Sequence, residues 1–480
     1  ALPILQHIEK ILGYLGYTED EAKGGATKIF ALESFLAKNS LSRTDRRDPS
    51  KIYHRLERKG LKLKVPHFNW DEYFAHSGVG QVQAINVSVP DFFSSLDEVF
   101  QEVGRLEDIK VYLKWRLVAA VMPALPNRFV NESFTFFAHS FSGQVKLEPR
   151  WKRCVKMVDR QLGFALSKSF VDLYYGSEGK KTTQALIERI EKSFENRLAQ
   201  IDWMDQKTRQ KAYKKVHTLM NKVGYPDVWR NYDAFVVDRG SYLLTLLRGG
   251  IFNSQYHLSK IGKPVDRQEW GMTPTTVNAY YDPSMNEMVF PAGILQPPFF
   301  SSNWTAESNF GGIGMVMGHE LTHGFDDEGR RYDAAGNLVD WWSPKVSRVF
   351  EARAQCMVSN YSAFEPLPGV HLNGKLTLGE NIADHGGLRL AYDAWKAAPA
   401  SSGVGSSSKY TEAQRFFLTF AQSWCSKRRE PYARMLATVD PHSPPQFRVN
   451  GTVSQFPRFS EAFQCRPGAP MAPVNRCEVW

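Results

Sequence analysis

The chain has 480 residues, of which 42% are hydrophobic, 13% aromatic and 23% charged, and its formal net charge is +10. This composition is typical of a globular protein and excludes collagen-like, low-complexity and wholly disordered chains. No run of 18 uncharged apolar residues occurs in the sequence, so we expect no membrane-spanning helix. The length indicates two to three domains.

The positive charge is unevenly distributed. Residues 271–480 contain 18 Lys and Arg against 19 Asp and Glu, so the positive excess lies in residues 1–270. A basic region of this kind can bind nucleic acid or an anionic membrane surface. Solvated basic side chains on helices are the simpler interpretation, because no zinc finger or RNA-binding signature accompanies the charge. We therefore predict no nucleic-acid partner.

Helical patterns dominate residues 1–250. Apolar residues recur every three to four positions in residues 2–15 and again, with interleaved charges, in residues 185–204. Asp205 precedes a further helical pattern over residues 206–220 and is a candidate N-cap. This part of the chain is therefore predicted to be mainly α-helical.

The character of the sequence changes after this helical part. Residues 262–290 contain β-favouring runs on both sides of the turn sequence 282–286, which predicts a hairpin. A helical pattern resumes over residues 309–325, and the Ser/Gly-rich residues 398–409 are predicted to form a surface loop. The fold class expected from these patterns is mainly α.

The cysteines and the Asn-x-Ser/Thr triplets give information about the cellular compartment in which the protein resides. The five cysteines are Cys154, Cys356, Cys425, Cys465 and Cys477. Without CxxC spacing a zinc–thiolate site is not expected, and their odd number in an oxidised protein implies a partner cysteine outside the chain. The triplets begin at Asn86, Asn131, Asn303, Asn360 and Asn450. These triplets weakly favour a secreted glycoprotein.

The strongest chemical signal is an HExxH motif formed by His319, Glu320 and His323. On a helix, His319 and His323 lie one turn apart on the same face and can occupy two corners of a zinc tetrahedron. Glu320 lies beside them without needing to be a ligand, so it can act on water near the metal. The alternative interpretation is a helix that carries two structural histidines.

A zinc site of this type needs a third protein ligand. A metzincin is excluded, because Asp326 and Gly329 occupy the positions where that class has glycine and histidine. A carboxylate from a second helix is the other common solution. Glu380 can supply it, and Asp384, one turn later, can accept the second ring N–H of a zinc histidine. Such an acidic pair on a helix is usually a surface feature, and only the presence of the HExxH motif makes it a candidate for the metal site.

Four segments make the sequence resemble the neprilysin and endothelin-converting-enzyme family of zinc metallopeptidases. The segments are 277–300, 311–342, 372–388 and 477–480. The resemblance covers essentially the whole chain and is densest over its C-terminal part.

The resemblance implies a two-domain, mainly α-helical ectodomain. Residues 1–262 would form a helical domain, and residues 263–480 a thermolysin-like catalytic domain, with a chamber enclosed between the two. It also implies one Zn²⁺ per chain, peptide substrates, and an extracellular or cell-surface location. The chain is shorter than the family's ectodomain, so an N-terminal part is expected to be missing, including any membrane anchor. The oligomeric state is left open.

The resemblance assigns the core of the site residue by residue. His319, His323 and Glu380 match the zinc ligands, and Glu320 matches the general base. Asp384 matches the carboxylate that holds a zinc histidine. The implied activity is hydrolysis of small peptides by water that the metal and Glu320 activate. An inactive fragment or a non-catalytic binding relative is the alternative.

Residues expected to contact the substrate follow from the same resemblance. Asn278 and Ala279 match the strand segment that grips the substrate backbone. His442 matches the histidine that stabilises the oxyanion, Asp440 its orienting partner, and Arg448 the arginine that holds the substrate carbonyl. From the residues alone, His442 and Arg448 would be an ordinary loop histidine and a solvated arginine.

An apolar subsite and a disulfide are also implied. The positions that match the wide subsite are Ile294, Phe299, Met315, Val316 and Trp424. Ordinary core packing is the alternative for each of them, whereas the resemblance implies cleavage on the amino side of large hydrophobic residues. Cys356 and Cys477 match a pair that form a disulfide, and the other three cysteines match ones whose partners lie upstream of this chain.

Overall fold

The computed structural model describes residues 2–101, 106–399 and 409–480, and these are mostly helical. This confirms the predicted mainly α class. Most of the predicted Ser/Gly-rich loop, residues 400–408, lies outside the described residues. Among the described helices, none is long and apolar enough to cross a membrane.

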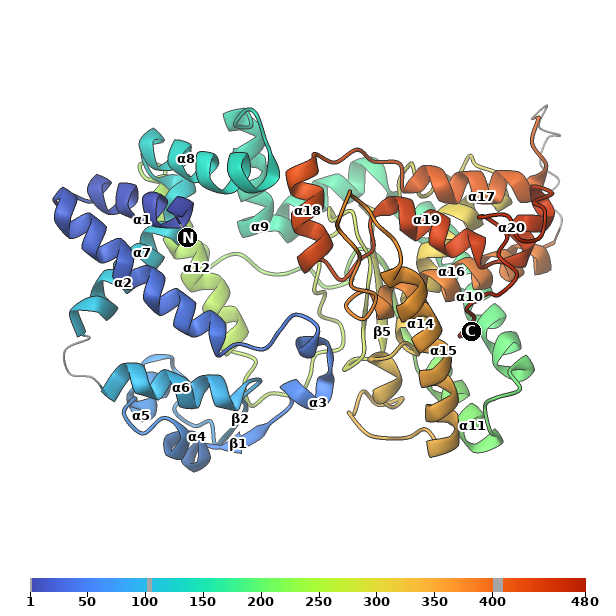
Figure 1. Cartoon of the computed structure of the whole chain (residues 1–480), viewed down its shortest axis with the longest axis horizontal. Helices are drawn as coiled ribbons and strands as arrows, with labels where there is room; N and C mark the ends of the chain where they lie inside the picture. Colours follow the sequence, from blue (N-terminus) through green and yellow to red (C-terminus); the bar gives the residue numbers. More distant parts are fainter. Residues whose placement is uncertain (1, 102–105, 400–408) are drawn as a thin grey trace. The chain divides into compact units, whose positions relative to one another are not determined.

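The contacts divide the chain into two compact units, which Figure 1 shows coloured along the sequence. Unit 1 consists of residues 1–157 and 231–266, and unit 2 of residues 158–230 and 267–480. This division differs from the predicted single boundary after residue 262. Residues 158–230 join unit 2 because the strand and helices in this segment pair and pack with the C-terminal part of the chain.

Unit 1 is built mainly of helices. Its helices and strands are α1 (Leu2–Tyr14), α2 (Glu19–Lys38), α3 (Pro49–Ile52), β1 (Arg55–Glu57), α4 (Arg58–Lys64), α5 (Trp70–His76), β2 (Ala84–Asn86), α6 (Pro90–Gln101), α7 (Leu106–Val121), α8 (Asn127–Ser133) and α12 (Tyr242–Leu258). The chain passes into unit 2 within α9 (Arg150–Tyr174). Short 3₁₀ or π-helical segments lie at Asp45–Arg47, Met122–Ala124 and Phe134–Phe141.

The predicted helix over residues 2–15 is confirmed by α1. Ile8, Ile11 and Leu12 are fully buried, and they pack with residues of α2, α7 and α8 in one apolar cluster. Thr18 caps α2, because its side chain accepts a hydrogen bond from the Glu21 N–H while the Glu21 carboxylate accepts one from the Thr18 N–H. A second cluster lies around α4, α5 and the β1–β2 pair.

Unit 2 holds one large core around a small sheet. Its elements after α9 are α10 (Gly176–Gln200), α11 (Gln206–His217), β3 (Met220–Gly224), β4 (Tyr280–Asp282), β5 (Glu287–Pro291), α13 (Ala306–Asn309), α14 (Met315–His323), α15 (Pro344–Ser362), α16 (Leu378–Ala397), α17 (Glu412–Ser423), α18 (Glu430–Val439), α19 (Pro445–Ser454) and α20 (Pro457–Ala462). The π-helical segment Phe310–Gly314 joins α13 to α14, and Gly329–Arg331 forms a 3₁₀ turn.

The two predicted helices around residue 200 are present but shorter than predicted, since α11 ends at His217 and Met220 already belongs to β3. Ile187, Ile190 and Phe194 of α10 are buried at helical spacing, but α10 ends at Gln200 rather than at residue 204. Asp205 is the N-cap of α11, and its carboxylate accepts a hydrogen bond of 2.8 Å from the Thr208 N–H.

The sheet of unit 2 has the strand order β3-β5-β4 within the described residues. β5 is central and wholly buried, pairs in parallel with β3 and forms an antiparallel hairpin with β4. This confirms the predicted hairpin. Its turn is held by the Asp282 carboxylate, which accepts hydrogen bonds from the N–H groups of Ser284 and Met285. β4 therefore lies at an edge of the sheet.

The predicted helix over residues 309–325 is formed by the end of α13, the π-helical segment and α14, which ends at His323. α14 is buried on nearly all sides and packs closely against α16. Glycine makes this approach possible. A Cβ atom on Gly387 of α16 would lie 2.5 Å from the His319 nitrogen, and one on Gly318 of α14 would lie 2.7 Å from the Gly387 oxygen. The two helices that carry the HExxH motif and Glu380 are thus adjacent.

The disulfide Cys356–Cys477 is present, as predicted, with its Cα atoms 5.6 Å apart. It ties α15 to the C-terminal segment. Among the described residues, Cys154, Cys425 and Cys465 form no disulfide.

Candidate metal centre and active site

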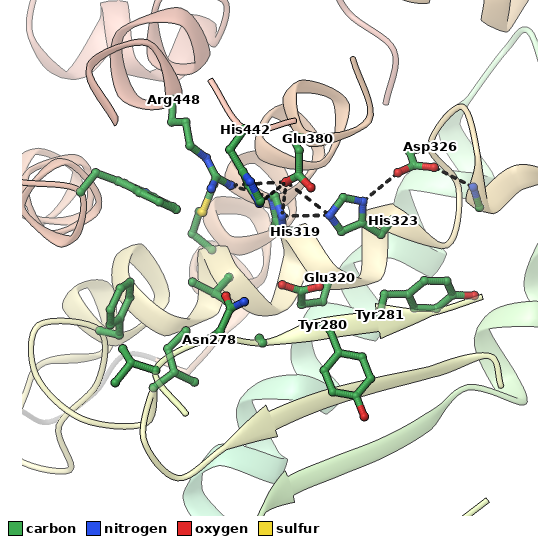
Figure 2. A pocket seen from close by; sticks show the side chains of 18 of the residues that line it. Asn278, Tyr280, Tyr281, His319, Glu320, His323, Asp326, Glu380, His442 and Arg448 are labelled. Atoms are coloured by element: carbon green, nitrogen blue, oxygen red, sulfur yellow. Dashed lines mark hydrogen bonds and ion pairs between the residues drawn. The ribbon is translucent and has the colours of Figure 1, made fainter. Parts of the chain in front are cut away.

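One pocket of about 400 Å³ in unit 2 gathers most of the predicted site residues (Figure 2). The predicted residues that line it are Asn278, Ala279, Ile294, Phe299, Met315, Val316, His319, Glu320, His323, Glu380, Trp424, His442 and Arg448. Asp384 and Asp440 do not line the pocket but lie behind residues that do. Helix α14 supplies five of these side chains, α16 supplies Glu380 and α19 supplies Arg448, whereas Asn278 and Ala279 lie immediately before the edge strand β4.

The two histidines of α14 are each oriented by a carboxylate. Nδ1 of His319 lies 2.8 Å from Asp384, and Nδ1 of His323 lies 2.7 Å from Asp326. Because an ionised carboxylate only accepts hydrogen bonds, each Nδ1 carries a proton, and in the neutral imidazoles that can bind a metal each Nε2 keeps a free lone pair. The two Nε2 atoms face each other at 3.0 Å.

Glu380 completes a set of three donor atoms. Its Oε2 lies 3.2 Å from Nε2 of His319 and 3.6 Å from Nε2 of His323, and it has no hydrogen-bond partner among the described residues. Zinc bonds of about 2.0–2.1 Å place tetrahedral ligands about 3.3–3.4 Å apart. Two lone pairs and a carboxylate oxygen at these spacings fit a zinc ion, with a fourth position left open.

Two carboxylates lie close to the histidines, and their positions separate their roles. Glu320 also lies within 4.8 Å of the histidine nitrogens. Figure 2 shows Glu380 on one side of the histidines and Glu320 on the other, toward the strand that carries Tyr280. Glu380 has one oxygen near both Nε2 atoms, so it is the better candidate for the third ligand. Glu320 then faces the space between the histidines and the strand that carries Tyr280 (Figure 2).

The pKa values of Glu320 and Glu380 are shifted in opposite directions, in agreement with the different roles that their positions suggest. Burial raises the pKa of Glu320 more than the nearby histidines lower it. For Glu380, burial also favours the neutral acid, but the charge of His323 and the contacts with both histidines hold its pKa well below its usual range. An ionised ligand next to a carboxylate that readily takes up a proton is a pairing suited to acid–base chemistry.

Arg448 and Asp384 form a buried pair behind His319. Nε and Nη2 of Arg448 donate hydrogen bonds of 2.8 and 2.6 Å to Asp384, which is fully buried. Burial opposes ionisation of Asp384, but Arg448 and His319 together hold its pKa at about 2. The guanidinium of Arg448 also lies 3.9 Å from the centre of the Trp424 ring. Asp384 therefore fixes both a histidine and the arginine at the pocket wall.

His442 reaches the site from the segment between α18 and α19. Its Nδ1 lies 2.8 Å from Asp440, whose carboxylate also accepts a hydrogen bond of 3.0 Å from the His442 N–H. Nε2 of His442 lies 3.4 Å from Glu380 Oε2, and 45% of its side chain is exposed. The imidazole is therefore oriented by Asp440 but open to a molecule in the pocket.

The remaining walls are an edge strand and an apolar flank. Asn278 is exposed and Ala279 is buried immediately before β4, whose only strand partner within the described chain is β5. The five predicted subsite residues line the pocket and also belong to, or pack against, the core of unit 2. These five residues therefore contribute to the core and also face the pocket, and their role as a substrate subsite stays a prediction.

Sequence reasoning missed several pocket residues. In the sequence, Asp326 serves only to exclude a metzincin, whereas in the structure its carboxylate holds His323. The role of Asp326 could have been recognised from local spacing, because Asp326 follows His323 by three residues at the end of the helix. Tyr281, Pro283 and Glu328 also line the pocket; they lie within segments that carry the family resemblance, which assigns them no role.

The chain was compared with known families and proteins. Two profiles of peptidase family M13 match it, over residues 3–226 and 278–479. Neprilysin-3 of Drosophila melanogaster is 35% identical over 497 residues, covering 99% of this chain and 63% of that protein. Endothelin-converting enzyme 1 of Homo sapiens is 36% identical, covering 100% of this chain and 64% of that protein. An endothelin-converting enzyme homolog of Locusta migratoria is 35% identical, covering 99% of this chain and 68% of that protein.

Solved structures give the same result. The crystal structure of a zinc metalloprotease of Mycobacterium tuberculosis in complex with an inhibitor has a TM-score of 0.93 and 36% identity, covering 100% of this chain and 74% of that one. PepO from Lactobacillus rhamnosis has a TM-score of 0.87 and 26% identity, covering 98% and 73%. The chain spans between 63% and 68% of the length of the three curated relatives described. The resemblance inferred from the sequence is confirmed: the chain belongs to peptidase family M13.

Proposed function

We propose that this chain is the catalytic part of a zinc-dependent endopeptidase that hydrolyses small peptides. The observation that carries the proposal is the convergence of Nε2 of His319, Nε2 of His323 and Oε2 of Glu380, with Glu320 on the opposite side of the same pocket. Family membership supports it, because relatives are named as zinc metalloproteases and converting enzymes.

In this mechanism His319, His323 and Glu380 would hold the zinc ion, which supplies Lewis acidity that polarises a peptide carbonyl. Glu320 takes a proton from the attacking water and then delivers it to the leaving amine. The buried position of Glu320 suits this exchange, because burial raises its pKa. Asp384 and Asp326 keep the ring protons of the two histidines on Nδ1.

Two further side chains are suited to the charge that develops on the carbonyl oxygen. The imidazolium form of His442, whose Nδ1–H donates to Asp440 and whose ring is open to the pocket, can donate a hydrogen bond from Nε2 to the oxyanion. Removal of one such donor typically lowers kcat about 10²–10³-fold. Arg448 lies at the wall beside Trp424 and is positioned to hold a substrate carbonyl.

We infer that the substrate binds as an extended strand along the segment Asn278–Ala279 that precedes β4. The edge of β4 offers backbone groups for such pairing. The apolar flank of five residues then receives the side chain that follows the cleaved bond, so large hydrophobic residues should be preferred on the carboxyl side of that bond.

The proposed location is extracellular or at the cell surface. The disulfide Cys356–Cys477 requires an oxidising compartment to persist. The Asn86, Asn131 and Asn303 side chains of the glycosylation triplets are exposed, in agreement with a glycoprotein.

The test is hydrolysis of a quenched peptide with a large hydrophobic residue after the scissile bond, with and without a zinc chelator. Glu320→Gln should keep stoichiometric zinc yet lose most turnover, because an amide cannot accept the proton. Glu188→Gln, at an exposed position of α10, is the matched control and should behave like the parent. Zinc binding without any hydrolysis by the parent would favour the non-catalytic alternative, and near-normal turnover by Glu320→Gln would reject the assigned base.

A further inference from the structure

Lys215, near the end of α11, is a buried cation outside the set of residues discussed above. It is 1% exposed. Its ammonium donates three hydrogen bonds, each of 2.7 Å, to the carbonyl oxygens of Gly324, Gly329 and Tyr332. A lysine has three donors, so all of them are used.

Aromatic rings complete the surroundings of this ammonium. Its nitrogen lies 5.7 Å from the centre of the Tyr281 ring, 5.3 Å from that of Phe325 and 6.0 Å from that of Trp341. Moving an ammonium group out of water is costly, but an apolar side chain at this site would leave the three carbonyl oxygens without hydrogen-bond partners. The arrangement therefore calls for a role that an apolar residue would not fulfil.

The three carbonyls belong to the segment 324–332, which directly follows the HExxH helix. This segment contains Asp326, whose Oδ2 lies 2.7 Å from Nδ1 of His323. Its Oδ1 accepts hydrogen bonds of 2.8 and 2.7 Å from the N–H groups of Glu328 and Gly329. The direction of the Asp326 carboxylate thus depends on the path of the segment, and Lys215 holds that path on both sides of Asp326.

The backbone of Lys215 contacts the other wall of the pocket. Its carbonyl oxygen accepts a hydrogen bond of 2.9 Å from Nδ2 of Asn286 in the β4–β5 turn. Asn286 has a positive φ of 46°, and its Oδ1 accepts a hydrogen bond of 2.9 Å from the hydroxyl of Tyr281, which lines the pocket. One residue of α11 therefore connects the loop behind the histidine to the hairpin that carries the edge strand.

We propose that Lys215 is a positioning residue of the metal site. Its ammonium holds the segment 324–332 so that Asp326 keeps Nε2 of His323 directed at the metal. This inference rests on the proposed function only in taking His319 and His323 as metal ligands, and it does not require that a peptide is cleaved.

The test replaces Lys215 by methionine, which keeps most of the side-chain length but removes the charge and all three donors. Lys214→Met, at the exposed neighbouring position of the same helix, is the matched control. The measurement is the zinc dissociation constant by competition with a chelator, at a temperature where circular dichroism shows both variants folded. Loss of a group that orients a metal ligand typically weakens binding about 10–100-fold. Because Lys215 acts through Asp326, we expect about a tenfold loss for Lys215→Met and none for Lys214→Met.

A double-mutant cycle with Asp326→Asn separates positioning from a general effect on folding. If Lys215 acts through Asp326, the two substitutions together should weaken zinc binding little more than Asp326→Asn alone, because both remove the same orientation of His323. Additive losses, or unchanged zinc affinity in folded Lys215→Met, would overturn the inference. A parent protein that binds zinc but cleaves no peptide would contradict the proposed activity alone.

Deuterium exchange provides the measurement where the methionine variant is poorly folded. Lys215→Gln keeps a shorter polar side chain, and in the metal-free protein it should speed exchange in the segment 324–332. Helix α10, whose buried face belongs to the core of unit 2, provides the internal control and should exchange as in the parent. Unchanged exchange in 324–332 would contradict the proposed role.

Discussion

Gly387→Ala should disrupt the metal site from a position that contacts no ligand side chain. Gly387 lies on α16, seven residues after Glu380, where that helix crosses α14. An added Cβ atom would lie 2.5 Å from the backbone nitrogen of His319, 2.8 Å from the Met315 oxygen and 2.9 Å from the His319 Cα atom. All three are backbone atoms, so none can rotate away.

The size of the effect follows from these distances. Ordinary van der Waals contacts begin near 3.4 Å, so the helices must separate locally by roughly 0.5–1 Å to accept the methyl group. Overpacking of this kind costs about 1–3 kcal/mol of folding stability. Metal–ligand distances tolerate only about 0.2 Å. Because His319 lies on one helix and Glu380 on the other, we expect zinc affinity to fall about tenfold or more.

The assay combines urea unfolding of the metal-free protein with zinc competition. Gly24→Ala is the control, because Gly24 lies inside helix α2 and a Cβ atom there would meet nothing within 4 Å. That change should be neutral or stabilise the fold by about 0.4–1 kcal/mol. A Gly387→Ala protein with the stability and zinc affinity of the parent would refute the argument that this close helix contact sets the ligand geometry.

Three other changes have defined outcomes. Glu380→Ala should abolish zinc retention in a metal-content assay, whereas Asp384→Ala should weaken zinc binding about 10–100-fold; equal retention by Glu380→Ala and the parent would mean that another residue is the ligand. Cys477→Ala opens the loop of 121 residues that the disulfide with Cys356 closes. Denaturant unfolding should show a loss of about 4–5 kcal/mol of folding stability in the chain-entropy model, and an unchanged stability would contradict this. Burial lowers the pKa of His7. The folded state therefore binds that proton at lower pH than the unfolded chain does, so stability should be lost as the pH falls below about 6.5, and His7→Gln should show a smaller fall in Tm between pH 7 and 5.

The elements that the sequence predicted well are those specified by local spacing. Ile8, Ile11 and Leu12 recur at helical intervals, so α1 could be recognised before any partner helix was known. Asp205 as an N-cap and the β4–β5 hairpin depend on residues only a few positions apart. The domain division could not be obtained in this way, because β3 joins β5 across a long stretch of intervening chain.

The residues of the candidate site can also be separated into those that local spacing predicts and those that it does not. The sequence alone determined that His319 and His323 share a helix face with Glu320 beside them, since this geometry follows from the pitch of an α-helix. The need for a third zinc ligand suggested Glu380 and Asp384 as candidates. Resemblance to a family assigned their roles and supplied the more distant residues, which no local pattern could have joined to the motif.

Only the tertiary structure decided how these groups meet. It placed Glu380 Oε2 near Nε2 of both histidines, made Asp384 the shared partner of His319 and Arg448, and put the Lys215 ammonium behind the loop that holds Asp326. Local spacing determines which face of a helix a side chain occupies, but not which helix packs against that face. That choice depends on the close contact of α14 with α16 and on the burial of polar groups that must find their partners far along the chain.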